Sequence, residues 1–167
     1  MRYTSIRSLD VSNGENIGVS LFVQGCDKKP HCKNCFNSNT WDFSGGKEWT
    51  EETKDKFMRL INRPYIKRVS ILGGEPLAGK NYLTIRHLLK EIKNKFPDKQ
   101  IWLYSGYDFE HFSREQLRTI IYVDVLVDGE YIDELRDITL KWRGSSNQRV
   151  IDVKKSIEKG EVVLWSD

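Results

Sequence analysis

Apolar and polar positions change their period along the chain, and this change predicts strands and helices in alternation. Short apolar runs rich in β-branched and aromatic residues predict four strands, at residues 19–23, 68–72, 101–104 and 123–127. Each of these runs ends in a turn that contains glycine and polar residues. A last short strand is expected at residues 162–165.

Spacings of three and four residues predict the helices between these strands. Thr50 is a suitable N-cap for the first helix, which Pro64 closes. The second helix has the clearest amphipathic pattern, with an apolar face made of Ile85, Leu88, Leu89, Ile92 and Phe96. Ser113 can cap a third, short helix, and a fourth is expected at residues 153–159. Strands and helices therefore alternate along the chain.

This alternation favours an α/β fold with a mostly parallel sheet and right-handed crossovers. The chain has 167 residues, whereas a closed eight-stranded barrel typically needs about 250. We therefore expect an open, partial (β/α) barrel formed by a single domain, residues 1–167. Because the carboxyl ends of parallel strands line the ligand site in such folds, the turns after the four strands are expected to meet on one rim.

The composition excludes some classes of partner. Lysine and arginine exceed aspartate and glutamate by 27 to 24, a mild and scattered excess that does not argue for nucleic acid binding. No apolar run is long enough for a membrane helix, and the first residues show no signal-peptide pattern. Cysteines without a disulfide framework suit a reducing compartment, so we expect a cytoplasmic location.

All three cysteines, Cys26, Cys32 and Cys35, lie close together in the sequence. An odd number leaves one thiol over in any disulfide arrangement. Three soft thiolates grouped in this way suit an iron–sulfur cluster or zinc. A four-iron cluster held by only three thiolates keeps one iron open to a further ligand, which indicates chemistry at the cluster.

Two other interpretations of the cysteines stay open at this point. His31 could complete a structural Cys3His zinc site, although it is adjacent to Cys32 and no second pair of ligands follows in the sequence. The thiols could also be ordinary reduced cysteines buried as small apolar residues. The charged and amide residues around them argue against such burial, so the cluster is the favoured interpretation.

Three motifs together resemble the radical S-adenosylmethionine superfamily. They are the cysteine group, Gly73-Gly74-Glu75-Pro76, and residues 142–149 with the sequence Trp-Arg-Gly-Ser-Ser-Asn-Gln-Arg. Within the superfamily they resemble the activating enzymes of the anaerobic (class III) ribonucleotide reductase. Residues 39–42 and 127–131 are similar to that family too, so the resemblance covers most of the chain. It implies that the open barrel is of the radical S-adenosylmethionine type.

The cysteine spacing departs from the pattern of the superfamily. Five residues separate Cys26 from Cys32, where the superfamily usually has three, while the two-residue spacing to Cys35 is kept. The extra residues are expected to bulge outward around Lys28-Lys29-Pro30. Such a bulge removes no ligand, but it changes the shape of the loop.

The resemblance implies a mechanism. The three cysteines would hold a [4Fe–4S] cluster, whose open iron would chelate the amino and carboxylate groups of S-adenosylmethionine. Reductive cleavage would release a 5′-deoxyadenosyl radical, which would take a hydrogen atom from a glycine of the anaerobic ribonucleoside-triphosphate reductase. That reductase is the implied partner, and a flavodoxin or ferredoxin is the implied electron donor. The protein itself would bind, orient and exclude water.

The Gly-Gly-Glu-Pro turn is a candidate for the methionine end of the cofactor. Gly73 and Gly74 would let the backbone approach it where a Cβ would crowd it. Their carbonyl groups and Glu75 could accept hydrogen bonds from the amino group. A plain turn from strand to helix would use the same residues, and in isolation that is the favoured interpretation.

Five further residues are candidate cofactor contacts. Ser105 and Gly106 would face the ribose and methionine, and Phe36 could pack on adenine, although a turn and the core explain these residues equally well. Asp128 could hold a cation or a polar part of the cofactor, or only form an Asp-Gly turn. Arg143 could pair with the cofactor carboxylate in the bidentate manner that arginine favours, or form a surface salt bridge.

Two other functions are alternatives. The chain could activate another glycyl radical enzyme of the pyruvate formate-lyase type, but its short length and residues 142–149 favour the reductase. It could also be a zinc-stabilised binding module without catalysis. Metal content separates this last class from the others.

Overall fold

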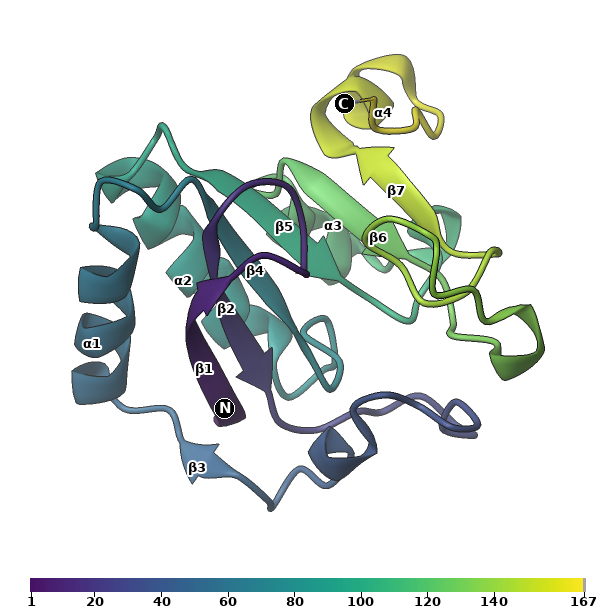
Figure 1. Cartoon of the computed structure of the whole chain (residues 1–167), viewed down its shortest axis with the longest axis horizontal. Coiled ribbons are helices and arrows are strands. Elements are labelled where there is room, and N and C mark those ends of the chain that lie inside the picture. The colour runs from purple at the N-terminus through teal and green to yellow at the C-terminus, as the bar shows by residue number, and fades with distance from the viewer. Residues whose placement is uncertain (167) are drawn as a thin grey trace.

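The four predicted apolar runs form the centre of one sheet. The computed structural model describes residues 1–166, and within them the sheet has seven strands in the order β3-β1-β2-β4-β5-β6-β7 (Figure 1). The strands are β1 (Arg2–Asp10), β2 (Gly18–Val23), β3 (Lys47–Glu48), β4 (Arg68–Gly73), β5 (Gln100–Tyr104), β6 (Val125–Asp128) and β7 (Arg149–Asp152). The helices are α1 (Glu51–Ile61), α2 (Tyr82–Lys95), α3 (Arg114–Ile120) and α4 (Val153–Lys159), with short 3-10 turns at Ser38–Thr40, Phe109–His111 and Asp133–Leu135.

The central strands are parallel, as the alternation predicts. β2 pairs with β4, β4 with β5, and β5 with β6 in parallel register. The outer pairs are antiparallel, because β1 lies between β2 and β3, and β7 runs against β6. Within the described residues, β3 and β7 form the two edges, so the sheet is open.

Alternate side chains of the central strands face two environments. One face packs against α1, α2 and α3 and forms the main core, in which Leu21 and Leu103 of the strands share a cluster with Leu89 of α2. Figure 1 shows α2 and α3 behind the strands. The opposite face carries Trp102 and Val127, which form a smaller cluster. The period of two along each strand thus leaves this second face available for a site.

The helix ends follow the predicted caps. Thr50 Oγ1 accepts a hydrogen bond from the Thr53 N–H at 3.2 Å, and Ser113 forms a reciprocal capping box with Gln116. α4 spans the predicted residues, and its cap is Asp152. None of the helices within residues 1–166 is both long and apolar enough to cross a membrane.

The edges of the sheet differ from the prediction. β1 and β7 were not expected as strands, since only one of the nine β1 residues is buried and β7 begins inside a polar motif. Their backbones are ordered by pairing with β2 and β6. The prediction of a strand at residues 162–165 is wrong, because within the described residues Leu164 makes only an isolated bridge to Ile151.

A buried ion pair lies beneath the connection between β1 and β2. The side chains of Asp10 and Arg68 are 0% exposed, and Arg68 Nη2 lies 3.8 Å from Asp10 Oδ1. The carboxylate also accepts from Ser20 and from the backbone N–H groups of Ser12 and Asn13. Burial by itself raises the pKa of Asp10, but these hydrogen bonds outweigh it and lower the pKa to about 2. Asp10 therefore holds the connection against β4 in its charged form.

Candidate functional site

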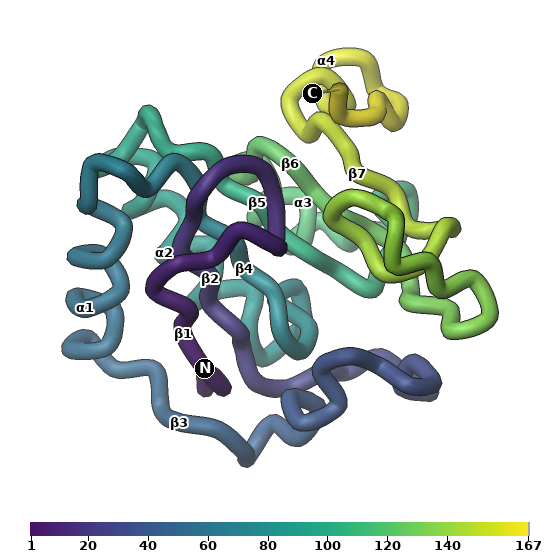
Figure 2. The backbone as a smooth tube through the Cα atoms, viewed as in Figure 1, coloured from purple at the N-terminus to yellow at the C-terminus, as the bar shows by residue number. Residues whose placement is uncertain are grey.

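The carboxyl ends of the parallel strands open into a cavity of about 610 Å³. Its other walls are the cysteine loop (residues 26–36) and residues 129–148, which lie side by side at one end of the sheet in Figure 2. The predicted site residues that line it are Cys26, Cys32, Cys35, Phe36, Gly73, Gly74, Glu75, Ser105, Gly106 and Arg143. The strand ends thus bring these distant motifs together, with Asp128 as the exception.

Backbone N–H groups act on the thiols of the cysteine loop. The Asn37 N–H donates to Cys35 Sγ at 3.4 Å, and the N–H groups of Lys28 and Tyr131 lower the pKa of Cys26 and of Cys32 respectively. Lys28 belongs to the loop itself, Asn37 directly follows it, and Tyr131 follows β6. These peptide dipoles by themselves favour the thiolate forms of Cys26 and Cys32.

Burial acts in the opposite direction on two of the thiols. It raises the pKa of Cys26 to about 11 and also raises the pKa of Cys32. Metal ions bind the thiolate, so ligation has to displace these protons. Binding of a metal group at this loop therefore releases protons.

The set of donors fits an iron–sulfur cluster. Soft thiolates that accept backbone hydrogen bonds are the ligands such clusters use. His31, the candidate fourth zinc ligand, stacks on Trp41 at a centroid distance of 4.2 Å, and its Nε2 lies 3.1 Å from the Cys26 carbonyl oxygen. Among residues 1–166, no three His, Cys, Asp or Glu side chains are arranged to hold a single metal ion. Cys26, Cys32 and Cys35 are the residues that would hold the cluster.

The extra residues of the cysteine loop do not simply bulge outward. Asp27 Oδ1 accepts from the Tyr107 hydroxyl at 2.7 Å, and its Oδ2 accepts from the Gly79 N–H at 3.3 Å. The side chain of Lys28 lines the cavity, whereas Lys29 and Pro30 after it are exposed. The expectation of an outward bulge is therefore wrong for Lys28, because the carboxylate of Asp27 attaches the loop to the ends of the sheet.

The two glycines after β4 are needed by the protein's own backbone. Gly73 has a φ of +112°, and a Cβ on it would lie 2.6 Å from the backbone N and O of Val23. A Cβ on Gly74 would overlap the carbonyl oxygen of Gly25. The close approach is thus between the ends of β2 and β4, which brings the cysteine loop next to the Gly-Gly-Glu-Pro turn.

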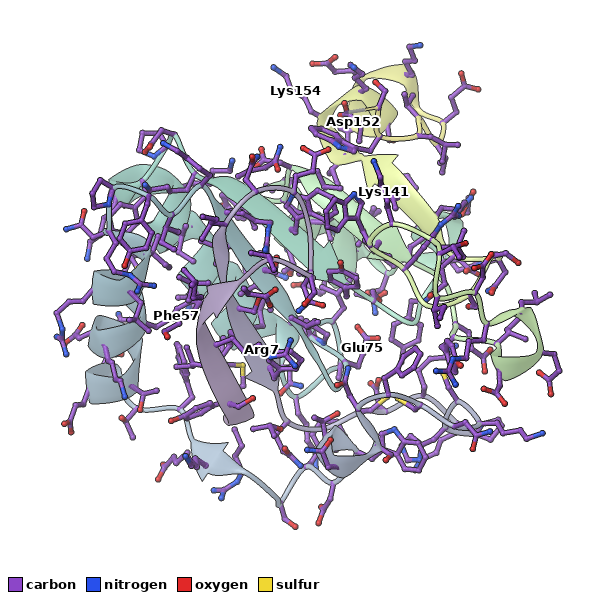
Figure 3. The ribbon with its side chains drawn as sticks, viewed as in Figure 1. Arg7, Phe57, Glu75, Lys141, Asp152 and Lys154 are labelled. Carbon is purple, nitrogen blue, oxygen red and sulfur yellow. The ribbon has the colours of Figure 1, made fainter. Side chains whose placement is uncertain are left out.

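Glu75 lies at the bottom of this rim and is 1% exposed. Its Oε1 accepts from the Ser105 hydroxyl at 2.9 Å and the Leu77 N–H at 3.0 Å, and its Oε2 accepts from the Gly106 N–H at 2.8 Å. Burial raises the pKa of Glu75 to about 7, against the effect of these donors. The carboxyl group therefore joins the ends of β4 and β5 and still faces the cavity (Figure 3).

Known proteins are similar in sequence to this chain. The family model of the 4Fe-4S single cluster domain matches residues 12–151. Over 150 residues the chain is 39% identical to the anaerobic ribonucleoside-triphosphate reductase-activating protein of Vibrio cholerae. The aligned region covers 89% of this chain and 96% of that protein. Proteins of the same name from Escherichia coli K12 (36% over 152 residues, 90% and 97% covered) and enterobacteria phage T4 (39% over 150 residues, 90% and 93%) are similar to it too.

The chain belongs to the family of anaerobic ribonucleoside-triphosphate reductase-activating proteins. The match to the cluster domain contains all three cysteines and the Gly-Gly-Glu-Pro turn. The chain thus carries a 4Fe–4S single cluster domain, and the zinc-stabilised binding module is not supported.

Three of the predicted cofactor contacts, Ser105, Gly106 and Phe36, line the cavity. Ser105 is buried, and Gly106 lies beside it on the cavity wall. Phe36 is 58% exposed and packs at a centroid distance of 4.9 Å against Tyr131, at the mouth of the cavity. Ser105 therefore hydrogen-bonds within the protein, to Glu75, and the ring of Phe36 also has the guanidinium of Arg136 5.4 Å from its centre.

Asp128 is not placed as predicted. Its carboxylate is 0% exposed and does not line the cavity. It accepts from Arg149 Nε at 3.0 Å and from the Phe109 N–H at 2.8 Å. Asp128 and Arg149 are direct partners in the β6–β7 register, so this pair holds the antiparallel edge of the sheet. A role in binding a cation or the cofactor is wrong for Asp128, because its oxygen atoms are occupied.

Residues 142–149 fold over the side of the cavity and are held by polar contacts. Gln148 accepts from the N–H groups of Gly144 and Ser145 and donates to the Gly129 carbonyl at 3.0 Å. Arg143 lines the cavity and donates through Nη1 to the Gln148 carbonyl. One arm of this guanidinium is therefore used to hold the segment in place.

Sequence reasoning missed several cavity residues. Arg7 lines the cavity from β1 and lies 4.8 Å over the ring of Phe22 (Figure 3). Tyr104 and Trp142 line it as well, and their buried hydroxyl and indole N–H have no hydrogen-bond partner within the described residues. Tyr104 could have been found from the alternation along β5, whereas Arg7 required knowledge that residues 2–10 form a strand.

Proposed function

We propose that this protein activates anaerobic ribonucleotide reductase by reductive cleavage of S-adenosylmethionine. The observation that carries the proposal is the single cavity that Cys26, Cys32 and Cys35 share with Glu75. The printed names of the relatives support the reductase as the partner, in preference to an enzyme of the pyruvate formate-lyase type. The whole chain, residues 1–167, would act as one open partial (β/α) barrel of the radical S-adenosylmethionine type.

The chain's residues would do the binding and positioning. Cys26, Cys32 and Cys35 would hold three irons of a [4Fe–4S] cluster and leave the fourth open. When bound, the cluster supplies the electron that splits S-adenosylmethionine, and the radical fragment released takes a hydrogen atom from a glycine of the reductase. Glu75 would accept from the amino group of the cofactor, and residues 129–148 would cover the site from the side.

The remaining contacts are assigned by their place on the cavity. Gly106 and Ser105 would lie along the ribose and methionine, Phe36 would pack on adenine, and Arg143 would contact the carboxylate. The open edge of the sheet would leave room for the glycine segment of the reductase. A flavodoxin or ferredoxin of the cytoplasm would supply the electron, and nucleic acid and membranes would have no part.

Anaerobic reconstitution with iron and sulfide tests the cluster. The reconstituted protein should be brown and contain about four irons per chain. Dithionite-reduced protein with S-adenosylmethionine and purified reductase should yield 5′-deoxyadenosine and a glycyl radical signal in electron paramagnetic resonance. Pyruvate formate-lyase in place of the reductase should give no signal. A colourless protein with one tightly bound zinc ion would contradict the proposal.

A further inference from the structure

Lys28 lies on the cavity wall although it belongs to the enlarged part of the cysteine loop. Its side chain is only 21% exposed, whereas Lys29 beside it is exposed to solvent. The hydrogen bonds of Asp27 to Tyr107 and Gly79 fix the loop immediately before it. Because the backbone before Lys28 is held by these hydrogen bonds, the loop fixes the direction in which the Lys28 side chain leaves it.

The side chain of Lys28 packs along Gly106 and Tyr107, which follow β5. Its ammonium lies 5.2 Å from the centre of the Tyr107 ring, a cation–π contact. A Cβ built on Gly106 would lie 3.5 and 3.6 Å from Lys28 Cγ and Cδ, so the aliphatic chain crosses directly over this glycine. The positive charge also lowers the pKa of Cys32, although burial of that thiol is the larger influence and raises it. The ammonium thus lies beside Tyr107, just after β5, within electrostatic reach of Cys32.

This ammonium is poorly satisfied by the protein. Within the described residues, the structure contains no hydrogen bond from Lys28 Nζ, and the one acidic oxygen within 4.0 Å is Oε2 of Glu130, at 4.0 Å. An ammonium carries three donors, and a largely buried charge is costly unless it is paired. Glu75, the other acid nearby, is already held by three protein donors. Lys28 therefore presents unused donors to the cavity.

We infer that Lys28 binds the carboxylate of the methionine part of S-adenosylmethionine. This inference rests on the proposed function. The cavity places a cation, Lys28, and a hydrogen-bond acceptor, the carboxyl group of Glu75, on the same side of Gly106. An α-amino acid offers the complementary carboxylate and ammonium groups. A phosphate group, with up to two negative charges, would meet the carboxylates of Glu75 and Glu130 as well. The two extra residues of the loop thus bring a specificity-determining cation into the site.

The test compares ligands that differ in the amino-acid part. The reconstituted protein is titrated by calorimetry with S-adenosylmethionine, with S-adenosylhomocysteine, which keeps the carboxylate, and with 5′-methylthioadenosine, which lacks it. Lys28→Met should weaken binding of the first two about ten- to a hundredfold and leave methylthioadenosine unchanged. Lys28→Arg should retain most of the affinity. Lys29→Met is the matched control and should bind all three ligands like the wild type.

Other outcomes of the titrations would show whether the assignment of Lys28 or the proposed function is wrong. If Lys28→Met binds S-adenosylmethionine as tightly as the wild type, the assignment of Lys28 is overturned while the proposed function stands. An equal loss of affinity for methylthioadenosine also overturns the assignment, because the substitution would then distort the site as a whole. The iron content and circular dichroism of Lys28→Met and Lys28→Gln would reveal such a distortion. A wild-type protein that assembles its cluster but binds neither sulfonium nor thioether ligand refutes the proposed function, and the assignment with it.

Discussion

The hydroxyl of Tyr107 donates a hydrogen bond of 2.7 Å to Asp27, a residue 80 positions earlier in the chain. Asp27 directly follows the first cysteine, and Tyr107 follows the end of β5. This contact attaches the enlarged cysteine loop to the sheet. It holds the start of the loop close to the end of β5.

Replacement of Tyr107 tests the importance of that attachment. Tyr107→Phe keeps the ring and removes the hydroxyl, so it should lower the free energy of unfolding by about 1 kcal/mol. It should also slow cluster assembly, because the loop would no longer be held before iron arrives. Denaturant unfolding and the rise of the cluster absorbance measure the two effects. Tyr122→Phe is the control, since the Tyr122 hydroxyl makes no hydrogen bond within the described residues, and equal behaviour of the two variants would contradict the prediction.

Removal of any single cysteine should abolish the cluster. Cys26→Ala, Cys32→Ala and Cys35→Ala each take away one of three thiolate ligands, so iron and sulfide content and radical formation should be lost. His31→Ala should leave them largely intact, because His31 contacts Trp41 and the Cys26 carbonyl. Iron analysis after anaerobic reconstitution decides this. Loss of metal from His31→Ala as complete as from the cysteine variants would return the zinc site to consideration.

The stability of the protein without its cluster should depend on pH through Glu75. The folded-state pKa of about 7 lies above the ordinary value of 4.5, so the fold favours the protonated form. The free energy of unfolding should therefore fall as the pH rises from about 4.5 to about 7, by about 3 kcal/mol, and change little above that. Urea unfolding at successive pH values measures it. Glu75→Gln should flatten this dependence and exposed Glu52→Gln should not; an unchanged slope in Glu75→Gln would exclude Glu75 as the cause.

Asp10 should have the opposite dependence at lower pH. Its folded-state pKa of about 2 lies below the ordinary 3.8, so its contribution is present above about pH 4 and is lost as the pH falls toward 2. The loss should be about 2 kcal/mol, seen as the difference between wild type and Asp10→Asn in acid unfolding experiments. At neutral pH, Arg68→Met should destabilise by about 3–5 kcal/mol, because it leaves Asp10 buried without a cation. An acid transition identical in wild type and Asp10→Asn would show that other carboxyl groups control it.

Arg143 should contribute to cofactor affinity and not to cluster binding. Arg143→Ala removes a guanidinium that lines the cavity, so binding of S-adenosylmethionine should weaken about ten- to a hundredfold. The absorbance and resonance spectra of the cluster should stay unchanged. Titration of the reconstituted variant provides the measurement, with Arg118→Ala on the exposed face of α3 as the control. Affinity equal to that of the wild type would remove Arg143 from the cofactor site.

The interior of the fold could be predicted from local pattern. The central strands β2, β4 and β5 and the amphipathic face of α2 appear at the expected residues, because burial on one or both sides imposes a period that is visible in a single segment. β6 is shorter than predicted and begins at Val125. The edge strands could not be predicted in this way. β1 buries only one of its nine residues, so it is ordered by its backbone hydrogen bonds to β2 and not by an apolar pattern of its own.

The sequence by itself indicated a cluster site, since three soft thiolates grouped within ten residues suit an iron–sulfur cluster in whatever way the loops run. The tertiary structure alone decided which charged groups face that site. Asp128 is paired with Arg149 in antiparallel strands that no local pattern predicts, so its carboxylate binds Arg149 at the edge of the sheet. Lys28 points into the cavity because Asp27 is attached to Tyr107. Electrostatic roles depend on distance and direction between residues far apart in the chain, and only strand register and loop path set these.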